Sequence, residues 1–325
     1  MTWLVTGGAG YIGAHIVQAM RSEGKTVVVL DDLSTGHATR IDGVPLVHGS
    51  VLDYQLVEHT LRRHAVTGIV HLAAKKQVDE SVRLPLYYYR ENVEGLRRLL
   101  EAAIATDVEA IVFSSSAAVY GAPTESWVTE DTQCSPINPY GHTKLTGEWM
   151  VEAAAAAAGL RYANLRYFNV AGCSSPTLAD LGGANIVPMV LRRLDAQQAP
   201  MIFGDSYPTQ DGTCVRDYVH VADIASAHAA AANALAGGDI KALTANIGTG
   251  VGYSVREIVE TLRVITGHES DAWAEPIVAP ARAGDPPRVV AATDRIRDAL
   301  GWRARHDVGQ MLTSAWEGWV ANRGR

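Results

Sequence analysis

Residues 6–13 read TGGAGYIG, after the short apolar run at 3–5 and ahead of a segment with helical periodicity. Gly7, Gly10 and Gly13 recur at every third position of this stretch. One glycine can make a tight turn, one can let the backbone approach a pyrophosphate, and one can let the helix pack on the strand. The helix N-terminus, with Tyr11 and Ile12, would present free N–H groups to phosphates. The stretch predicts a dinucleotide site; the alternative is an ordinary loop, because the spacing is GxxGxxG instead of GxGxxG.

Two carboxylates close the next apolar run. Asp31 and Asp32 follow residues 27–30, and Asp31 comes eighteen positions after Gly13. A carboxylate at this place can accept both ribose hydroxyls of an adenosine and would repel the extra phosphate of NADP. The pair therefore favours NAD as the cofactor, and the alternative is that these residues only end the strand and begin a turn.

Strand patterns and helix patterns alternate through the first half of the chain. Apolar, β-branched runs lie at 27–30, 68–71 and 110–113, and helical patterns lie at 52–63, 86–105 and 140–158. This alternation predicts an α/β fold, a Rossmann-type doubly wound parallel sheet with helices on both faces. The alternation loosens after Asn169. We expect an NAD-binding domain over 1–168 and a smaller mixed α/β substrate lobe over 169–325, with segments near 214–247 returning to the first domain.

Composition narrows the class of protein. The net charge is -7 and hydrophobic residues make up 47% of the 325 positions, which predicts a packed core and no basic face for nucleic acid. No run of 18 apolar residues occurs, so we expect no membrane segment. Cys134, Cys173 and Cys214 form no CxxC or Cys/His pattern, which argues against a metal site or a disulfide framework. A reducing, cytoplasmic compartment is the expectation.

Tyr140 and Lys144 are the candidate catalytic pair. They are four apart in a helical pattern, which places their Cβ atoms roughly 5–6 Å apart on one face. A nearby ammonium and a nicotinamide cation would both favour the phenolate and lower the pKa of the tyrosine. Ser116 ends the run at 110–113 at the carboxyl edge of the sheet, where ligands bind in open α/β folds. The alternative is that Ser116 caps a loop and Tyr140 is a half-buried aromatic residue.

Further motifs lie along almost the whole chain. They are DDL (31–33), ESV (80–82), SSSAAVYG (114–121), YGHTK (140–144), LRYFNVAG (165–172), DGTCVRDYVHV (211–221) and GDPPR (284–288). Together with TGGAGYIG they make the chain resemble the extended short-chain dehydrogenase/reductase family, and within it the UDP-sugar 4-epimerase branch. The resemblance implies a lobe that holds NAD tightly, a C-terminal lobe that clamps a UDP-sugar, and a homodimer formed by the helices near 86–105 and 140–158.

The resemblance also implies a role for each matching residue. It makes Tyr140 the base, Lys144 its partner, and Ser116 the hydroxyl that bonds the sugar 4-OH. The implied cofactor contacts are Gly7, Gly10, Tyr11, Ile12, Gly13, Asp31, Asp32, Leu72, Ala73, Ala74, Lys76, Asn92, Tyr140, Lys144 and Tyr167. The implied substrate contacts are Lys76, Ser116, Asn169, Asn185, Arg216, Arg282 and Asp285. The two arginines would face the diphosphate, since guanidinium forks suit phosphates, and the alternative for them is a surface ion pair.

The chain departs from the family pattern at a few positions. Ser50 stands where many relatives carry an acidic residue that meets the adenine, and Ala118 stands where relatives often carry threonine. Val289 aligns with a pocket-wall position that can hold tyrosine in relatives restricted to glucose and galactose. We therefore expect room for an N-acetyl group on the sugar, and the alternative is that Val289 only completes an apolar strand.

The reaction that the resemblance implies is interconversion of UDP-galactose and UDP-glucose through a 4-keto sugar, with the cofactor regenerated in each turnover. A nucleotide-sugar 4,6-dehydratase or decarboxylase is the competing interpretation. Dehydratases carry an Asp–Glu pair directly after the catalytic hydroxyl residue, where this chain has Ala117 and Ala118. A non-catalytic NAD-binding protein is the third possibility, although it would have no use for Ser116, Tyr140 and Lys144 together.

Overall fold

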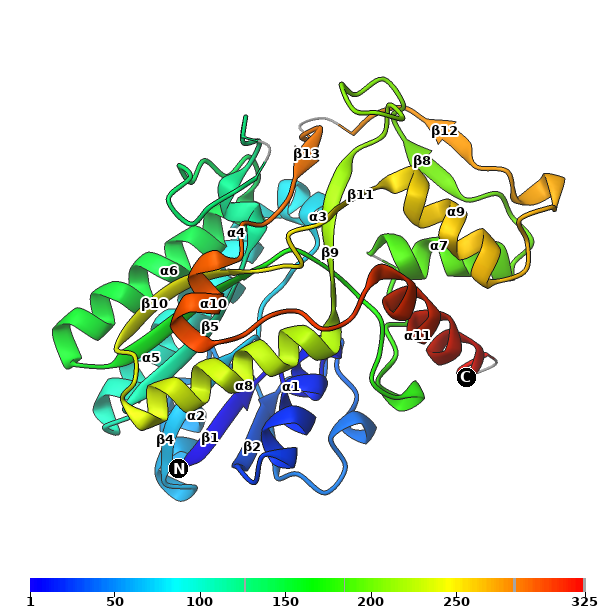
Figure 1. The fold of residues 1–325 in the computed structure, drawn as a ribbon. Coiled ribbons are helices and arrows are strands. Elements are labelled where there is room, and N and C mark those ends of the chain that lie inside the picture. The colour runs from blue at the N-terminus through cyan, green and yellow to red at the C-terminus, as the bar shows by residue number, and fades with distance from the viewer. Residues whose placement is uncertain (126, 184, 283–284, 324–325) are drawn as a thin grey trace.

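A parallel sheet forms the centre of the molecule. The computed structural model describes residues 1–125, 127–183, 185–282 and 285–323. Within these residues seven strands pair in the order β10-β6-β5-β4-β1-β2-β3, each pair in parallel (Figure 1). They are β1 (Thr2–Thr6), β2 (Thr26–Asp31), β3 (Leu46–His48), β4 (Val66–His71), β5 (Ala110–Ser116), β6 (Arg161–Tyr167) and β10 (Ala242–Ile247). The predicted doubly wound sheet is confirmed.

Helices cover both faces of this sheet. On one face lie α1 (Tyr11–Ser22) and α8 (Val221–Gly237); on the other lie α2 (Tyr54–Arg63), α5 (Gly95–Ala105) and α6 (Pro139–Ala158). Successive side chains of a strand point to opposite faces, so Leu4 packs with the α2, α5 and α6 layer while Val5 packs with α1 and α8. Both faces are therefore buried, which explains why these strands read as continuous apolar runs.

The helix expected at 86–105 contains an irregular turn. The structure has α3 (Val78–Arg83), then α4 (Pro85–Tyr88), a π-helical turn at Tyr89–Glu94, and then α5. π turns are rare and frequently lie at functional sites. Asn92 lies in this turn and is buried, where its side chain bonds the backbone of Lys75. The polar partner explains why a helix with an apolar face departs from regular geometry here.

The helix that carries the candidate catalytic pair has clear boundaries. The Asn138 side chain accepts a hydrogen bond from Gly141 N at 2.9 Å, and Pro139 occupies the first helical position. At the other end Gly159 adopts φ +72°, a left-handed conformation that glycine reaches without strain. These signals fix where α6 begins, and hence where Tyr140 lies.

The second half of the chain builds a smaller lobe beside the sheet (Figure 1). A small sheet contains β7 (Asn169–Ala171), β9 (Val215–His220), β11 (Gly252–Ser254) and β13 (Arg288–Val289), and β8 (Met201–Phe203) pairs with β12 (Ile277–Ala279). The helices α7 (Ile186–Asp195), α9 (Val255–Ile265) and α11 (Val308–Val320) share a separate apolar core. Between these segments the chain crosses back, since α8, β10 and α10 (Asp294–Leu300) pack with the central sheet. The domain boundary at 168/169 stays a prediction.

Candidate functional site

The three glycines of the turn after β1 do different work. Gly7 has φ +71°, and a Cβ there would lie 2.8 Å from Ala73 N. A Cβ on Gly13 would lie 2.1 Å from Gly7 O, so only glycine lets α1 pack this closely. At Gly10 the nearest atom to such a Cβ is Gly7 O at 3.2 Å, so its outer side is open. Gly10 precedes α1 and no side chain caps the helix, which leaves its first N–H groups free for an anion.

Asp31 and Asp32 close β2 beside this turn. Asp31 is buried and accepts hydrogen bonds from Ala9 N at 2.9 Å and Leu33 N at 2.8 Å, which hold the carboxylate in one orientation. Each carboxylate oxygen has a further lone pair for a ligand hydroxyl. Asp32 accepts from Ser34 N and Oγ. Two carboxylates at one strand end disfavour an additional phosphate, so the residues present fit NAD.

The turn opens into a cleft of about 680 Å³, called here the main cleft. It lies at the carboxyl ends of β1, β2, β4 and β6 and includes the point between β1 and β4 where the strand order reverses, the usual ligand site of such sheets. The predicted residues that line it are Gly7, Gly10, Tyr11, Ile12, Gly13, Asp31, Asp32, Leu72, Ala73, Ala74, Lys76, Tyr140, Lys144, Tyr167 and Asn185. Gly49 and Ser50 also line it, at the end near Asp32.

Tyr140 and Lys144 lie at the wall of this cleft, and Ser116 lies beside Tyr140, behind the residues that line it. The phenol of Tyr140 is hydrogen-bonded to Ser116, and Lys144 Nζ lies 6.0 Å from the centre of the Tyr140 ring. Lys144 Nζ donates to Ser114 O at 2.7 Å, which fixes the ammonium beside the end of β5. The structure therefore brings the three candidate catalytic residues together.

Burial sets the protonation of this trio. Burial lowers the pKa of Lys144 to about 8, against the carboxylate of Glu148, which raises it. Burial raises the pKa of Tyr140, and the hydrogen bond from Ser116 lowers it in part. In the protein alone the pKa of the Tyr140 phenol is therefore raised, because the effect of burial exceeds that of the hydrogen bond. A bound nicotinamide cation would supply the further positive charge that favours the phenolate.

Several predicted contacts lie outside the main cleft. Asn92 is buried behind it, donating to Lys75 O at 2.9 Å and accepting from Lys75 N at 2.8 Å, so it holds the loop after β4. Asn169 is exposed at the start of β7. Arg216 and Asp285 pair with each other at 3.4 Å.

The remaining predicted residues lie at the smaller lobe. Arg282 lies over the Phe203 ring at 4.1 Å from its centre, which leaves its guanidinium edge for other contacts. Asn185 precedes α7 and donates to Asp180 Oδ2 at 2.7 Å. Gly284 of the GDPPR motif lies outside the described residues. The smaller lobe thus provides two arginines. One of them, Arg216, forms an ion pair with Asp285 that a bound diphosphate could replace.

Two cationic side chains are among the cleft residues that the sequence analysis missed. Lys75 lines the main cleft beside Lys76 and donates to Ser34 Oγ at 3.0 Å, so it crosses the cleft mouth. Arg40 also lines the cleft and donates to Ala179 O at 3.0 Å, linking the two halves of the chain. Because lysine is scarce in this chain, Lys75 could have been proposed as a site residue from the sequence. No local sequence pattern distinguishes Arg40 from the other arginines.

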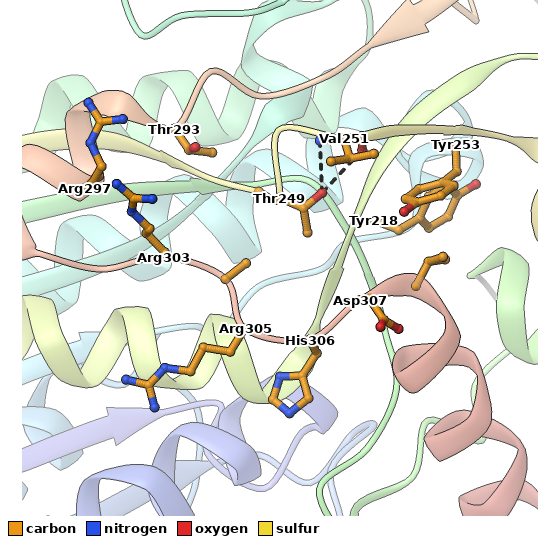
Figure 2. Close-up of a pocket in the computed structure, with 13 residues that line it drawn as sticks. Tyr218, Thr249, Val251, Tyr253, Thr293, Arg297, Arg303, Arg305, His306 and Asp307 are labelled. Carbon is orange, nitrogen blue, oxygen red and sulfur yellow. Dashed lines mark hydrogen bonds between the residues drawn. The ribbon is translucent and has the colours of Figure 1, made fainter.

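A second hollow of about 390 Å³ lies between the loop at 248–253 and the C-terminal segment at 303–308 (Figure 2). None of the predicted site residues lines it. Three of its charged residues are engaged within the protein: Arg297 pairs with Asp298 at 2.8 Å, His306 with Asp223 at 3.0 Å, and Asp307 caps α11. Arg303 and Arg305 also line it. Its described residues hold no arrangement of nucleophile and base.

Comparison with known proteins places this geometry in a family. Residues 3–248 match the NAD dependent epimerase/dehydratase family. The chain belongs to this family. A UDP-glucose 4-epimerase from Azospirillum brasilense is 44% identical over 309 residues, covering 94% of this chain and 87% of that protein.

Two solved structures of the family resemble the whole chain. A UDP-glucose 4-epimerase from Brucella ovis in complex with NAD is 37% identical, with a TM-score of 0.90 and coverage of 97% of both chains. One from Bifidobacterium longum in complex with NAD+ and UDP is 32% identical, with a TM-score of 0.91 and coverage of 99% of both chains. NAD is accordingly the cofactor of this family member.

Two further features of the described residues bear on the site. No group of three or more histidine, cysteine or carboxylate side chains there could hold a metal ion. Among the same residues, none of the helices is long and apolar enough to cross a membrane.

Proposed function

We propose that this enzyme of the NAD dependent epimerase/dehydratase family interconverts UDP-galactose and UDP-glucose by inverting C4 of the sugar. The observation that carries the proposal is that Tyr140 and Lys144 line a cleft that also contains the glycine turn, with Ser116 beside the Tyr140 phenol. A hydroxyl, a phenol and an ammonium beside a nicotinamide are the groups that a proton-and-hydride transfer needs. The epimerase relatives support the choice of sugar and nucleotide.

Each side chain has a separate task. Tyr140 takes the proton from the sugar 4-hydroxyl and returns it, and Ser116 holds that hydroxyl and the phenol in one line. Lys144 stabilises the phenolate, and its bond to Ser114 O keeps the ammonium from drifting into the cleft. Bound NAD supplies the group that accepts the C4 hydrogen and gives it back, and Gly10, Asp31 and the start of α1 would hold it.

Substrate binding is assigned to the smaller lobe and the mouth of the cleft. Asn185, Arg216 and Arg282 would hold the UDP, with Asp285 released from Arg216 to meet the uridine ribose. Binding energy from the nucleotide end keeps the keto sugar from leaving while the sugar itself stays free to turn. Lys76, Asn169 and Tyr167 complete the proposed contacts near the sugar and the nicotinamide.

Elimination of water has little support. A dehydratase needs an acid and a base near C5 and C6 of the sugar, and Ala117 and Ala118 follow the catalytic hydroxyl instead. The carboxylate of Glu80 does line the main cleft, but it accepts a hydrogen bond from Tyr88 at 2.9 Å. We therefore propose the isomerase and not the lyase.

The test uses Tyr140→Phe and the wild-type protein. Conversion of UDP-galactose to UDP-glucose is followed by NMR, and cofactor released by denaturation is identified. The phenylalanine variant should keep its NAD and lose at least roughly a hundredfold in kcat, the scale of a lost general base. Near-normal turnover would show that another base is used, and a wild-type protein without epimerase activity would reject the proposal.

A homodimer is part of the proposal. The helices α3, α4 and α6 pack against one another and expose apolar side chains, among them Leu86 (82% exposed) and Trp149 (59% exposed). An exposed apolar surface of this kind is typical of a protein–protein contact. Leu86→Asp should convert the dimer to a monomer in size-exclusion chromatography with light scattering; a wild-type monomer would refute the dimer. A cytoplasmic location also stays a prediction. The three cysteines are free thiols, as a reducing compartment would keep them.

A further inference from the structure

A buried carboxylate lies one helical turn beyond Lys144. Glu148 follows Lys144 by four positions on α6, so the two side chains share one face of the helix. Only 1% of Glu148 is exposed. It accepts hydrogen bonds from Arg166 Nε at 2.9 Å and Arg166 Nη2 at 2.6 Å, and a third from Ser115 Oγ. The mechanism above gives this residue no task.

The Glu148–Arg166 pair is tied to the strand that carries Ser116. Three consecutive serines at the end of β5 each bond α6: the Ser114 carbonyl accepts from Lys144, Ser115 donates to Glu148, and Ser116 bonds Tyr140. On its other side Arg166 donates to Tyr120 Oη at 2.9 Å. Glu148 is thus the middle of three links that set α6 against the end of β5.

The charges around Lys144 come from few groups. His71 on β4 faces it, and burial lowers the pKa of His71 to about 3, so that imidazole is neutral. From β6, Tyr167 lies beside Tyr140, and burial raises the pKa of its phenol, so it too is neutral. The Phe113 ring lies under the ammonium at 5.1 Å.

The ionised groups near Lys144 belong to the pair and its surroundings. Arg166 is a cation that faces Glu148 from β6, and Glu152 lies a further turn along α6. Arg166 forms a bidentate pair with Glu148 and so holds the carboxylate in one orientation, one helical turn from Lys144. The carboxylate offsets part of the effect of burial, which otherwise lowers the pKa of Lys144.

We propose that Glu148, held by Arg166, is a positioning residue for the reaction: it keeps Lys144 protonated and placed beside Tyr140. The proposal rests on the proposed function for the tasks of Tyr140 and Lys144. It assigns no contact between Glu148 and the substrate. If Glu148 served only to pair with Arg166, its replacement would lower stability and would not change the protonation of Lys144.

Lys144 can be titrated directly, because the chain has only five lysines. Protein grown with ¹³C-labelled lysine gives one Cε signal for each, and Lys144→Met assigns the signal of Lys144. In wild-type protein without substrate this signal should titrate at about pH 8. In Glu148→Gln it should titrate about one pH unit lower or more, the shift that loss of a close opposite charge produces. This measurement needs no turnover, so it stands whether or not the proposed function does.

Activity gives the second measurement. Above both pKa values the ammonium fraction falls roughly tenfold for each pH unit by which the pKa drops. The kcat of Glu148→Gln should therefore match wild type on the acidic side and fall roughly tenfold or more on the basic side, with KM unchanged. Glu148→Asp keeps the negative charge, so its kcat at basic pH should be close to that of the wild type.

Asp223→Asn is the matched control. Asp223 is buried to a similar extent and also accepts three hydrogen bonds, from Arg305 N, His306 N and His306 Nδ1, but it lies on α8 and not on the helix of Lys144. Its loss should lower stability and leave the pH profile of kcat as in wild type. If Glu148→Gln does not fold, the uncharged pair Glu148→Gln with Arg166→Gln replaces it, again with Lys144 titrating below wild type. An unchanged Lys144 titration in a folded variant, or a loss of kcat that is equal at every pH, would overturn the proposal.

Discussion

For single residues, alanine at Gly13 should reduce stability, whereas alanine at Gly10 should reduce NAD binding. A Cβ on Gly13 meets Gly7 O at 2.1 Å, and backbone cannot give way, so Gly13→Ala should cost about 3 kcal/mol of unfolding free energy or more. At Gly10 the closest protein atom is 3.2 Å away, so Gly10→Ala should fold with a cost of about 1 kcal/mol or less. Because Gly10 lines the main cleft, the added methyl group should instead hinder the approach of the pyrophosphate, and this variant should be purified with little NAD. Urea denaturation and the NAD content measure the two effects, and a full NAD content in Gly10→Ala would contradict this role.

We predict that Val289 sets how large a sugar the enzyme accepts. Val289 is 7% exposed on β13 and packs in an apolar cluster with Val119 and Phe168, and Ala117, which follows Ser116, packs against the same cluster. We expect measurable epimerisation of UDP-N-acetylglucosamine by the wild-type enzyme. In Val289→Tyr the larger ring should project into the sugar space and reduce activity on the N-acetylated sugar far more than on UDP-galactose. Thermal stability serves as the control for overpacking; equal losses on both sugars, or no N-acetyl activity in the parent, would reject the idea.

At the scale of elements, the start of α6 carries the reacting phenol. The Asn138 side chain caps this helix, and Tyr140 is its second residue. Asn138→Ala removes the cap and should lower the unfolding free energy by about 1 kcal/mol, while Asn138→Asp should keep it. Because fraying begins at Tyr140, kcat should fall with the alanine variant and not with aspartate. Urea denaturation and steady-state kinetics of both variants measure this, and an alanine variant with wild-type kcat would show that β5 alone holds Tyr140.

Local sequence predicted most of the elements, although not the π-helical turn at Tyr89–Glu94, and it did not predict their long-range partners. The glycine turn, the apolar runs and the Tyr140–Lys144 spacing predicted the sheet and the site, because each signal lies within a few residues. The pairing of Glu148 with Arg166 and the bonding of Asn92 to Lys75 join segments distant in the chain, and a single sequence carries no local mark of either. The same reason hid the Arg216–Asp285 pair, which depends on β9 lying beside β13.

At the scale of the whole molecule, buried neutral histidines should make the fold sensitive to mild acid. Burial lowers the pKa of His15, His220 and His228 to about 4, and that of His71 to about 3. The unfolded chain binds a proton at each below about pH 6.5, and the folded state does not. Their contribution is therefore complete above that pH and is lost as the pH falls toward 4, by the order of 1–2 kcal/mol each at about pH 5.

Urea denaturation at several pH values measures this loss. His228 is held by Ser114 Oγ at 2.8 Å and Ile224 O, so glutamine can partly replace its hydrogen bonds. In His228→Gln the decrease in unfolding free energy between about pH 7 and pH 5 should be smaller than in the wild type by the contribution of one histidine. An unfolding free energy independent of pH over this range would show that these imidazoles are protonated in the fold.

Epimerisation through a 4-keto sugar requires that the hydrogen at C4 leaves the sugar and returns to the same carbon while the cofactor stays bound. UDP-galactose carrying deuterium at C4 tests it directly, with the position of the label in the product read by NMR. Removal and return at one cleft predict UDP-glucose with the deuterium retained at C4. Deuterium at C6 of a keto sugar, as in a dehydration, or its loss to solvent would contradict the account.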